Sequence, residues 1–281
     1  MLKNIVLHWR HLMLQLFVVL GGTWTILEFL ISATNFDPKN YSAAYVSIVI
    51  LFSLIVALFL VWRRVRSTEF TLRGTNTRIR ISFGDVFGST SSLVIPANTN
   101  FDHELQEENG PAMPVSVKSV HGQLVQHVGA ASFRERVDSA LSGVKPVSTD
   151  SQRKLRPHEA YALGTVAQIS SETQKFYLVA LTQTDPETWK ARTKLTEVFS
   201  ALTAAWRTIG QINDQEPLIM PLIGSGFANL RIDPEHLLDI LIASIVESTF
   251  QDGCIANEIE IMLPKSKIGE IRCYNVANEW S

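Results

Sequence analysis

The sequence has few of the residues that metal and redox sites need. It contains only two cysteines, Cys254 and Cys273, and these lie too far apart for a metal-binding or redox pair. We expect both to stay reduced and inert in a cytoplasmic domain. The seven histidines lack the spacing of metal ligands. We therefore expect neither a metal nor a cofactor.

Common nucleotide and nucleic-acid motifs are also missing. No G-x-x-x-x-G-K-[ST] segment occurs, which argues against a P-loop nucleotidase. The charge is nearly balanced, with 25 basic and 27 acidic residues. One basic loop, residues 153–156, has no aromatic platform beside it and is expected to be a solvated turn. We therefore expect no nucleic-acid partner.

What the sequence does have is two long apolar runs near its start. Residues 12–31 carry one charge, Glu28, and residues 43–62 carry none. A helix of roughly 20 apolar residues crosses a bilayer core of about 30 Å, so each run is long enough to span. The alternatives are two buried helices of a soluble core, or a cleaved signal peptide for the first run. The former would need helices without a polar face, and the latter leaves the second run unexplained.

Basic residues flank the two runs on the outside of the pair. Lys3 and Arg10 precede the first run, and Arg63, Arg64 and Arg66 follow the second. By the positive-inside rule, both termini are expected in the cytoplasm. The sequence thus predicts a transmembrane hairpin over residues 1–66, with spans at about 12–31 and 43–62, and a cytoplasmic domain over 67–281.

Polar and small residues within the spans are candidates for assembly contacts. A carboxylate at mid-bilayer costs at least about 2–3 kcal/mol, so Glu28 either faces a bundle interior or reaches the outer interface. Small residues four apart allow close helix approach in lipid, although they also occur by chance. The candidate assembly residues are Glu28, Gly21, Thr25, Ser53 and Ala57.

Strand and helix patterns alternate after residue 67. Such alternation predicts a mostly parallel sheet with helices on both sides. The expected strands are 69–83 (two, around 74–76), 93–95, 164–169, 176–181, 218–223 and 259–263. The expected helices are about 124–141, 188–209 and 234–250.

An apolar run at residues 218–223 breaks abruptly into glycines. Gly224 and Gly226 let the backbone approach a phosphate closely, and Asp233-Pro234 then marks a helix start. This is the pattern of a strand that ends in an anion-binding loop, where backbone N–H groups point at the ligand. A turn that binds nothing has the same composition.

Three strand ends together resemble the macro domain, an α/β/α module that binds ADP-ribose and its derivatives. The resemblance rests on Ile-Ser-Phe-Gly-Asp-Val at 81–86, Leu-Val-Ile-Pro-Ala-Asn at 93–98 and Pro-Leu-Ile-Gly-Ser-Gly-Phe at 221–227, in the family's order. It covers about residues 70–263. It implies an α/β/α sandwich with a mixed, mostly parallel sheet, preceded here by the two-helix hairpin.

The resemblance also implies binding roles. Asp85 takes the place of the aspartate that accepts from the adenine amine, and Asn98 that of the asparagine beside the distal ribose. Residues 224–227 take the place of the loop around the diphosphate, and His121 lies in the other phosphate loop. Taken singly, Asp85 and Asn98 are also ordinary turn residues. The implied ligand-binding residues are Asp85, Val86, Asn98, Ser119, His121, Gly122, Gly224, Ser225, Gly226, Phe227, Ala228 and Asn229.

The departures from the family concern catalysis. Macro domains that hydrolyse ADP-ribose esters usually read Asn-Ala-Ala-Asn, and Ile95 stands at the first asparagine position. Ile95 can neither orient water nor bond a ribose hydroxyl. The glycine-rich first loop is replaced by Ser-Val-His-Gly at 119–122. We therefore assign no catalytic residue.

The whole chain resembles the transmembrane and macro-domain effectors of Thoeris anti-phage systems. This implies a receptor in the bacterial inner membrane, a TIR-domain partner that makes an ADP-ribose-derived messenger such as an amino-acid adduct, homo-oligomerisation on activation, and disruption of the lipid bilayer. The alternatives are a membrane-tethered ADP-ribosyl hydrolase and a membrane scaffold with a protein-binding domain.

Overall fold

The computed structural model describes residues 9–34, 42–108, 110–155, 157–223, 232–268 and 270–280. The chain divides into two compact units. One comprises Met1–Thr68 and Ile268–Tyr274, and the other comprises Glu69–Lys267 and Asn275–Ser281.

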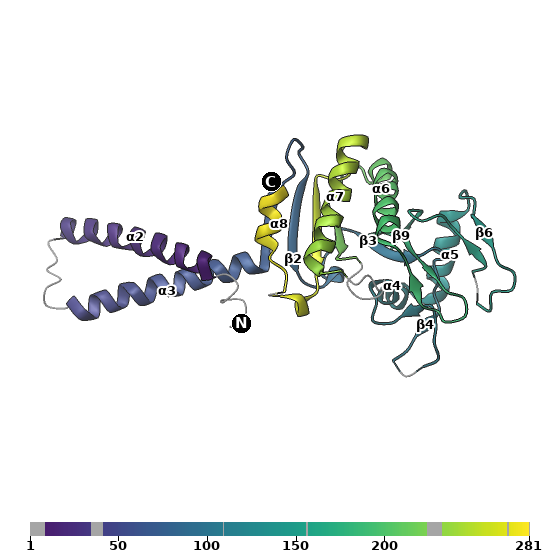
Figure 1. The fold of residues 1–281 in the computed structure, drawn as a ribbon, viewed down its shortest axis with the longest axis horizontal. Helices are drawn as coiled ribbons and strands as arrows, with labels where there is room; N and C mark the ends of the chain where they lie inside the picture. Colours follow the sequence, from purple (N-terminus) through teal and green to yellow (C-terminus); the bar gives the residue numbers. More distant parts are fainter. Residues whose placement is uncertain are drawn as a thin grey trace. The chain divides into compact units, whose positions relative to one another are not determined.

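The N-terminal unit contains two apolar helices, α2 (Trp9–Thr34) and α3 (Ser42–Arg66), which pack against each other (Figure 1). The segment Leu12–Phe29 of α2 is long and apolar enough to cross a membrane. The apolar segment of α3, Val46–Leu60, is shorter. Among the described residues, the first expected span is therefore long enough to cross a membrane. The apolar segment found for the second expected span is shorter than a membrane span requires.

The small residues of this unit differ in their surroundings. Ser53 and Ala57 are buried together with Val49, at four-residue intervals along one face of α3. Gly21 and Thr25 are exposed on α2, where the Thr25 hydroxyl donates to the Gly21 carbonyl at 2.9 Å. Hence one predicted pair is buried in the packed unit and the other is on its surface, as is Glu28.

The second unit is built on one large mixed sheet with the order β1-β2-β12-β11-β3-β9-β10, and β8 pairs with β9 off this path. Its centre is parallel from β2 to β9, whereas β8 and β10 run antiparallel to β9. The strands are β1 (Ser67–Thr71), β2 (Arg78–Phe83), β3 (Ser92–Asn98), β8 (Val166–Ser170), β9 (Lys175–Thr184), β10 (Ala191–Arg192), β11 (Leu218–Pro221) and β12 (Glu258–Leu263).

Helices cover both faces of this sheet (Figure 1). On one face, α4 (Val120–Val128) and α5 (Ala130–Leu141) enclose a core in which Ile95 of β3 and Leu178 of β9 are fully buried. On the other, α6 (Leu195–Ile212) packs on β9 and on α7 (Pro234–Asp252). The fold is the α/β/α sandwich that the sequence predicts.

Two helix predictions are wrong in detail. The helix expected over 124–141 is broken into α4 and α5 at Gly129, whose φ of +84° a continuous helix does not allow. The helix expected over 188–209 begins only at Leu195. The residues before it form a turn and β10, because the side chain of Asp185 accepts from the backbone N–H groups of Glu187 and Thr188.

Small elements complete the two units, and the sequence patterns did not predict them. They are too short to show periodicity. They are β4 (Leu105–Gln106), β5 (Val115–Ser116), β6 (Ser148–Thr149), β7 (Glu159–Ala160), the 3₁₀ turns η2 (Val86–Gly88) and η3 (Lys265–Lys267), and α8 (Cys273–Trp280).

Candidate functional site

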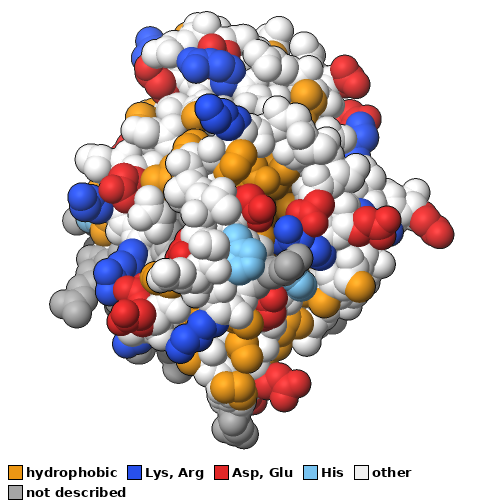
Figure 2. All heavy atoms as spheres, turned by 90° about the vertical axis from the view of Figure 1, so that its right-hand side faces the viewer, with side chains coloured by type: hydrophobic (Ala, Val, Ile, Leu, Met, Phe, Trp, Pro, Cys, Tyr) orange, Lys and Arg blue, Asp and Glu red, His pale blue; other side chains and the backbone are white. Residues whose placement is uncertain are grey.

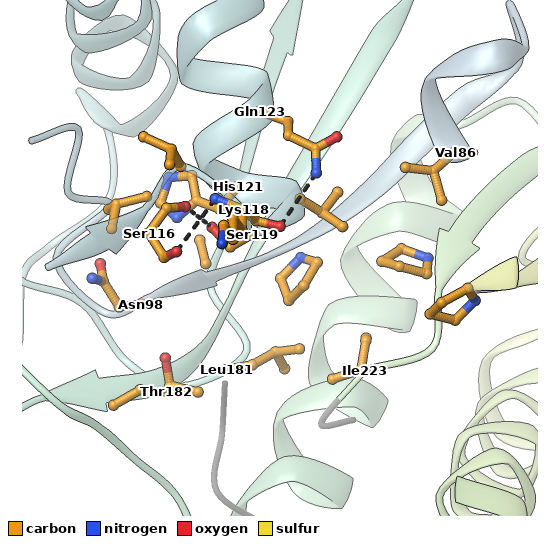
Figure 3. A pocket seen from close by; sticks show the side chains of 18 of the residues that line it. Val86, Asn98, Ser116, Lys118, Ser119, His121, Gln123, Leu181, Thr182 and Ile223 are labelled. Carbon is orange, nitrogen blue, oxygen red and sulfur yellow. Dashed lines mark hydrogen bonds between the residues drawn. The ribbon is translucent and has the colours of Figure 1, made fainter. Parts of the chain in front are cut away.

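A cavity of about 1060 Å³ lies at the carboxyl ends of the parallel strands. This volume is at the upper end of the range for small-molecule sites, roughly 300–1,000 Å³. In Figure 3, Val86 and Asn98 lie on opposite sides of it, with Leu181 and Ile223 between them. The location is the one at which open α/β sheets bind ligands.

Asp85 and Val86 border the cavity beyond the end of β2. The Asp85 carboxylate caps the 3₁₀ turn η2 by accepting from the Phe87 backbone N–H at 3.1 Å. Asp85 is exposed, and Val86 is buried with 7% of its surface exposed. A carboxylate has several acceptor positions, so capping leaves Asp85 able to accept from a ligand donor as well.

Asn98 lies at the end of β3 and is 5% exposed. Its side-chain amide donates to Asp102 Oδ2 at 2.8 Å and to Thr184 Oγ1 at 3.0 Å, and its carbonyl oxygen accepts from the Asp102 backbone N–H at 3.1 Å. Both amide hydrogens are therefore committed inside the protein. Only the second lone pair of the carbonyl oxygen remains for a ligand.

Behind Asn98 lies a buried ion pair that the sequence analysis missed. Arg153 donates from Nη1 to Asp102 Oδ1 at 2.8 Å and from Nη2 to Oδ2 at 2.7 Å, and it also donates to the Pro157 carbonyl at 2.6 Å. Burial is the main cause that raises the Asp102 pKa, and the Arg153 contact acts against it. The prediction of a solvated turn is wrong for Arg153, which is 7% exposed; Arg156 lies outside the described residues.

Trp189 borders the cavity beyond the end of β9. The guanidinium of Arg153 lies over its ring, 5.3 Å from the centroid. Trp189 falls within the helix that was expected over about 188–209; instead it has a φ of +56° in the turn that follows Asp185. The signal overlooked in the sequence is Asp185-Pro186, which favours a turn at this point.

The first turn of α4 forms another wall. Ser119 caps the helix by accepting from the Gly122 backbone N–H at 2.9 Å. Figure 3 shows Ser116, Lys118, Ser119 and His121 grouped on this side. Gly122 is not part of the cavity lining; it packs closely against the backbone of Ser116.

His121 is the buried titratable group of this wall. It is 6% exposed, packs on the ring of Phe133 at 5.5 Å, and its Nε2 has no hydrogen-bond partner among the described residues. Burial lowers its pKa to about 4, with the nearby charge of His103 as a second cause. His121 is therefore neutral at physiological pH, with one ring nitrogen unsatisfied.

Charges of both signs surround the cavity. Glu108 and Lys118, which border the cavity, form an exposed ion pair at 2.5 Å, and Lys265 also borders the cavity. On the face shown in Figure 2, acidic and basic side chains are interspersed. This is the distribution expected for a small ligand with mixed polarity rather than for a polyanion.

The remaining predicted residues, Gly224, Ser225, Gly226, Phe227, Ala228 and Asn229, lie outside the described residues. The three residues immediately before this segment, Pro221, Leu222 and Ile223, line the cavity. Ile95 does not reach the cavity; its side chain is buried in the core between the sheet and α4.

The Oceanobacillus iheyensis macrodomain with ADP is a similar solved structure: it is 14% identical, with a TM-score of 0.47, over 76% of this chain and 93% of its own. The macrodomain of Mycobacterium tuberculosis DarG is 14% identical, with a TM-score of 0.42, over 66% and 97%. The Trypanosoma brucei macrodomain in complex with ADP-ribose is 11% identical, with a TM-score of 0.42, over 72% and 68%. No curated protein matches the chain.

The sequence itself matches one family model, described as Thoeris protein ThsA, Macro domain. The match covers residues 79–264, which is more than half of the chain. It contains the sheet apart from β1 and the first residue of β2, both helix layers, and most of the residues that line the cavity. The chain therefore belongs to the family of the Thoeris ThsA macro domain.

Proposed function

We propose that this chain is a membrane-anchored receptor for an ADP-ribose derivative. In this proposal a TIR-domain partner makes the ligand, and its binding drives homo-oligomerisation and disruption of the bacterial inner membrane. The observation that carries the proposal is a large cavity at the strand ends of a ThsA-type macro domain, in a chain that also contains a helix of membrane-span length.

The order of the strands supports a defined orientation of the ligand. Asp85 follows β2, the segment after Ile223 follows β11, and Asn98 ends β3; these strands lie in the order β2-β12-β11-β3. In the proposed orientation the adenine amine donates to Asp85, the diphosphate lies beyond β11, and the distal ribose donates to the free lone pair of Asn98. Backbone N–H groups at the start of α4 then also face the phosphates.

The environment of Ile95 favours a receptor over a hydrolase. The residue occupies the position at which hydrolytic macro domains have an asparagine, and its side chain lies in the core. It provides no group that orients water. In this proposal the domain binds its ligand, and no residue is assigned a catalytic role.

Activation requires that the ligand bind the assembled state more tightly than the resting state. A change from 1:99 to 99:1 needs about 5.5 kcal/mol of differential binding free energy, which several protomers would share. The exposed Gly21, Thr25 and Glu28 of α2 are the residues proposed for contacts between protomers, since Ser53 and Ala57 are already buried in one protomer.

The binding step is tested with the purified full chain in detergent. ADP-ribose and an amino-acid adduct of ADP-ribose are titrated by calorimetry, and the recovered ligand is analysed by chromatography. We expect binding without turnover. Turnover would support the hydrolase instead, and absence of binding by either compound would refute both nucleotide functions.

The membrane step is tested in cells that also produce the TIR-domain partner. We expect depolarisation, followed with a potential-sensitive dye, for the full chain. A chain that begins at Ser67 lacks α2 and α3 and is expected not to depolarise the cells. Equal toxicity from the two chains would refute the membrane role.

A further inference from the structure

We propose that the assembled chain conducts cations through a pore lined by α2, and that Glu28 of each protomer contributes to a ring of carboxylates at one mouth of this pore. The inference rests on the proposed function, because it needs the assembled state. It adds an activity, cation-selective conduction, where the proposed function requires only that the bilayer be disrupted. It depends on three observations within the N-terminal unit.

The first observation is the outer surface of α3. This helix packs against α2 through a face that buries Val49, Ser53 and Ala57 (Figure 1). Its exposed side chains among the described residues are apolar apart from Ser47, and they are Val46, Ile48, Ile50, Leu51, Phe52, Leu54, Ile55 and Phe59. Lipid chains are as apolar as these side chains, so α3 is suited to face the bilayer.

The second observation is a stripe of exposed residues along α2, spaced alternately four and three apart. The α2 stripe comprises Leu14, Val18, Gly21, Thr25, Glu28 and Ser32. Because each residue turns a helix by about 100°, these positions lie on one side of α2. Leu16, Thr23 and Leu27 are partly buried on the other side, where α3 packs. The α2 stripe therefore points away from α3, toward the centre of a ring in which further copies of α2 meet.

The third observation is the chemistry of the α2 stripe, which changes along the helix. Leu14 and Val18 are apolar, whereas Thr25 and Glu28 in the second half present oxygen atoms. The Thr25 hydroxyl donates to the Gly21 carbonyl at 2.9 Å, so only the lone pairs of its oxygen are left for another partner. A carboxylate is likewise an acceptor. A pore lined by such groups stabilises cations and repels anions.

A pore also explains how an exposed carboxylate is accommodated in an apolar helix. Glu28 lies within the span-length segment Leu12–Phe29 and is exposed in the single protomer. Contact between a carboxylate and hydrocarbon is costly, and acidic residues in membrane helices usually face a bundle interior or water. In a ring of α2 helices every Glu28 faces the water of the pore, and α3 lies between this ring and the lipid.

The apolar half of the α2 stripe forms a constriction. From Val18 to Glu28 the helix rises by about 15 Å, at 1.5 Å per residue. Leu14 and Val18 thus lie well away from the carboxylate ring. An apolar constriction blocks ions when it loses its water. Glu28 therefore determines which ions pass, and Leu14 and Val18 determine whether they pass.

The test measures currents through the purified full chain in planar bilayers of phosphatidylcholine, with unequal KCl concentrations on the two sides. The probes are ADP-ribose and an amino-acid adduct of ADP-ribose. We expect a probe to open currents whose reversal potential gives a K⁺-to-Cl⁻ permeability ratio of at least about 5, the effect of one charge pair in water.

Glu28→Gln removes the charge and keeps the size of the side chain. It should lower the permeability ratio to about 1 or below, because Lys3 and Arg10, which the sequence places before and at the start of α2, are basic. Binding of the probes, measured by calorimetry in detergent, should not change, because Glu28 belongs to the N-terminal unit and the cavity to the other.

A matched pair of serine variants tests the constriction. Val18→Ser makes the apolar half of the α2 stripe wettable and should produce current without any probe. Ile55→Ser replaces an exposed side chain of α3, which faces lipid in this arrangement, and should leave the current without a probe unchanged. Equal currents from the two variants would contradict a pore along α2.

The outcomes separate the pore from the receptor function. Equal permeability to K⁺ and Cl⁻ in the wild type refutes the selective pore, as does the absence of current from a chain that binds a probe. An unchanged ratio in Glu28→Gln also refutes it and means that Glu28 only reaches the membrane surface. In each case a chain that binds a probe keeps its receptor function. If the chain binds neither probe and gives no current, the receptor function is refuted and the pore with it.

Discussion

Asn98 and Asp102 are joined by two hydrogen bonds, one from the Asn98 amide to the Asp102 carboxylate at 2.8 Å and one from the Asp102 backbone N–H to the Asn98 carbonyl at 3.1 Å. Asn98 is therefore a structural residue as well as a proposed ligand contact. Its substitution changes both the stability of the cavity floor and the affinity for ligand, and these effects have to be measured separately.

Asn98→Asp is expected to destabilise the domain by about 2 kcal/mol. The new carboxylate would face Asp102 without a hydrogen to donate. The loss in free energy of unfolding relative to wild type, measured by urea unfolding in detergent, should become smaller as the pH falls. At lower pH the new carboxyl group is protonated and can again donate a hydrogen bond to Asp102. Thr184→Val removes only the second acceptor of the Asn98 amide and should lower the free energy of unfolding by less. An equal decrease would contradict this explanation.

Arg153→Met is expected to destabilise the domain by about 3–5 kcal/mol, because Asp102 would remain buried without its partner. Asp102→Leu alone leaves the buried Arg153 cation unpaired in the same way. The double variant should lose much less free energy of unfolding than the sum of the losses of the two single variants. A double-mutant cycle measured by urea unfolding tests this. Additive losses would mean that the ion pair does not act as a unit.

Gly122→Ala is expected to destabilise the domain by about 1–3 kcal/mol and to weaken ligand binding. An added Cβ would overlap the Ser116 carbonyl oxygen and would lie 3.0 Å from Val117 Cα, so the start of α4 would have to move. Thermal unfolding and calorimetric titration measure the two effects. The matched control is Gly143→Ala, where a Cβ meets nothing within 4 Å; if both variants behave alike, close packing of α4 is not important.

His121 is expected to make stability depend on pH. Its pKa is about 4 in the folded chain and about 6.5 when unfolded, so the unfolded chain takes up the proton first. The free energy of unfolding should therefore fall as the pH decreases from about 6.5 to about 4, by on the order of 3 kcal/mol. His121→Gln does not titrate and should reduce this slope; an unchanged slope would show that other groups cause it.

Local patterns in the sequence predict the architecture well. The apolar run of α2, the alternation in β2, the continuous apolar runs of β3 and β9, and the Asp-Pro start of α7 all depend on neighbouring residues. Asp85 and Asn98, from the strand ends that resemble a macro domain, line one cavity, and so does His121, which the same resemblance named. Such features are encoded within a few residues, so the sequence shows them directly.

The roles of individual side chains were decided by tertiary structure. Asp102 and Arg153 are 51 residues apart, and no spacing rule connects them. Trp189 lies in a turn rather than in the expected helix, because the Asp185 side chain accepts hydrogen bonds that stabilise the turn, and the Arg153 guanidinium lies over its ring. The sequence by itself determined the membrane-length helix, the fold class and the edge of the sheet that forms the cavity. Only the tertiary structure decided which polar groups of that cavity already have hydrogen-bond partners inside the protein, because those partners come from distant segments that folding brings together.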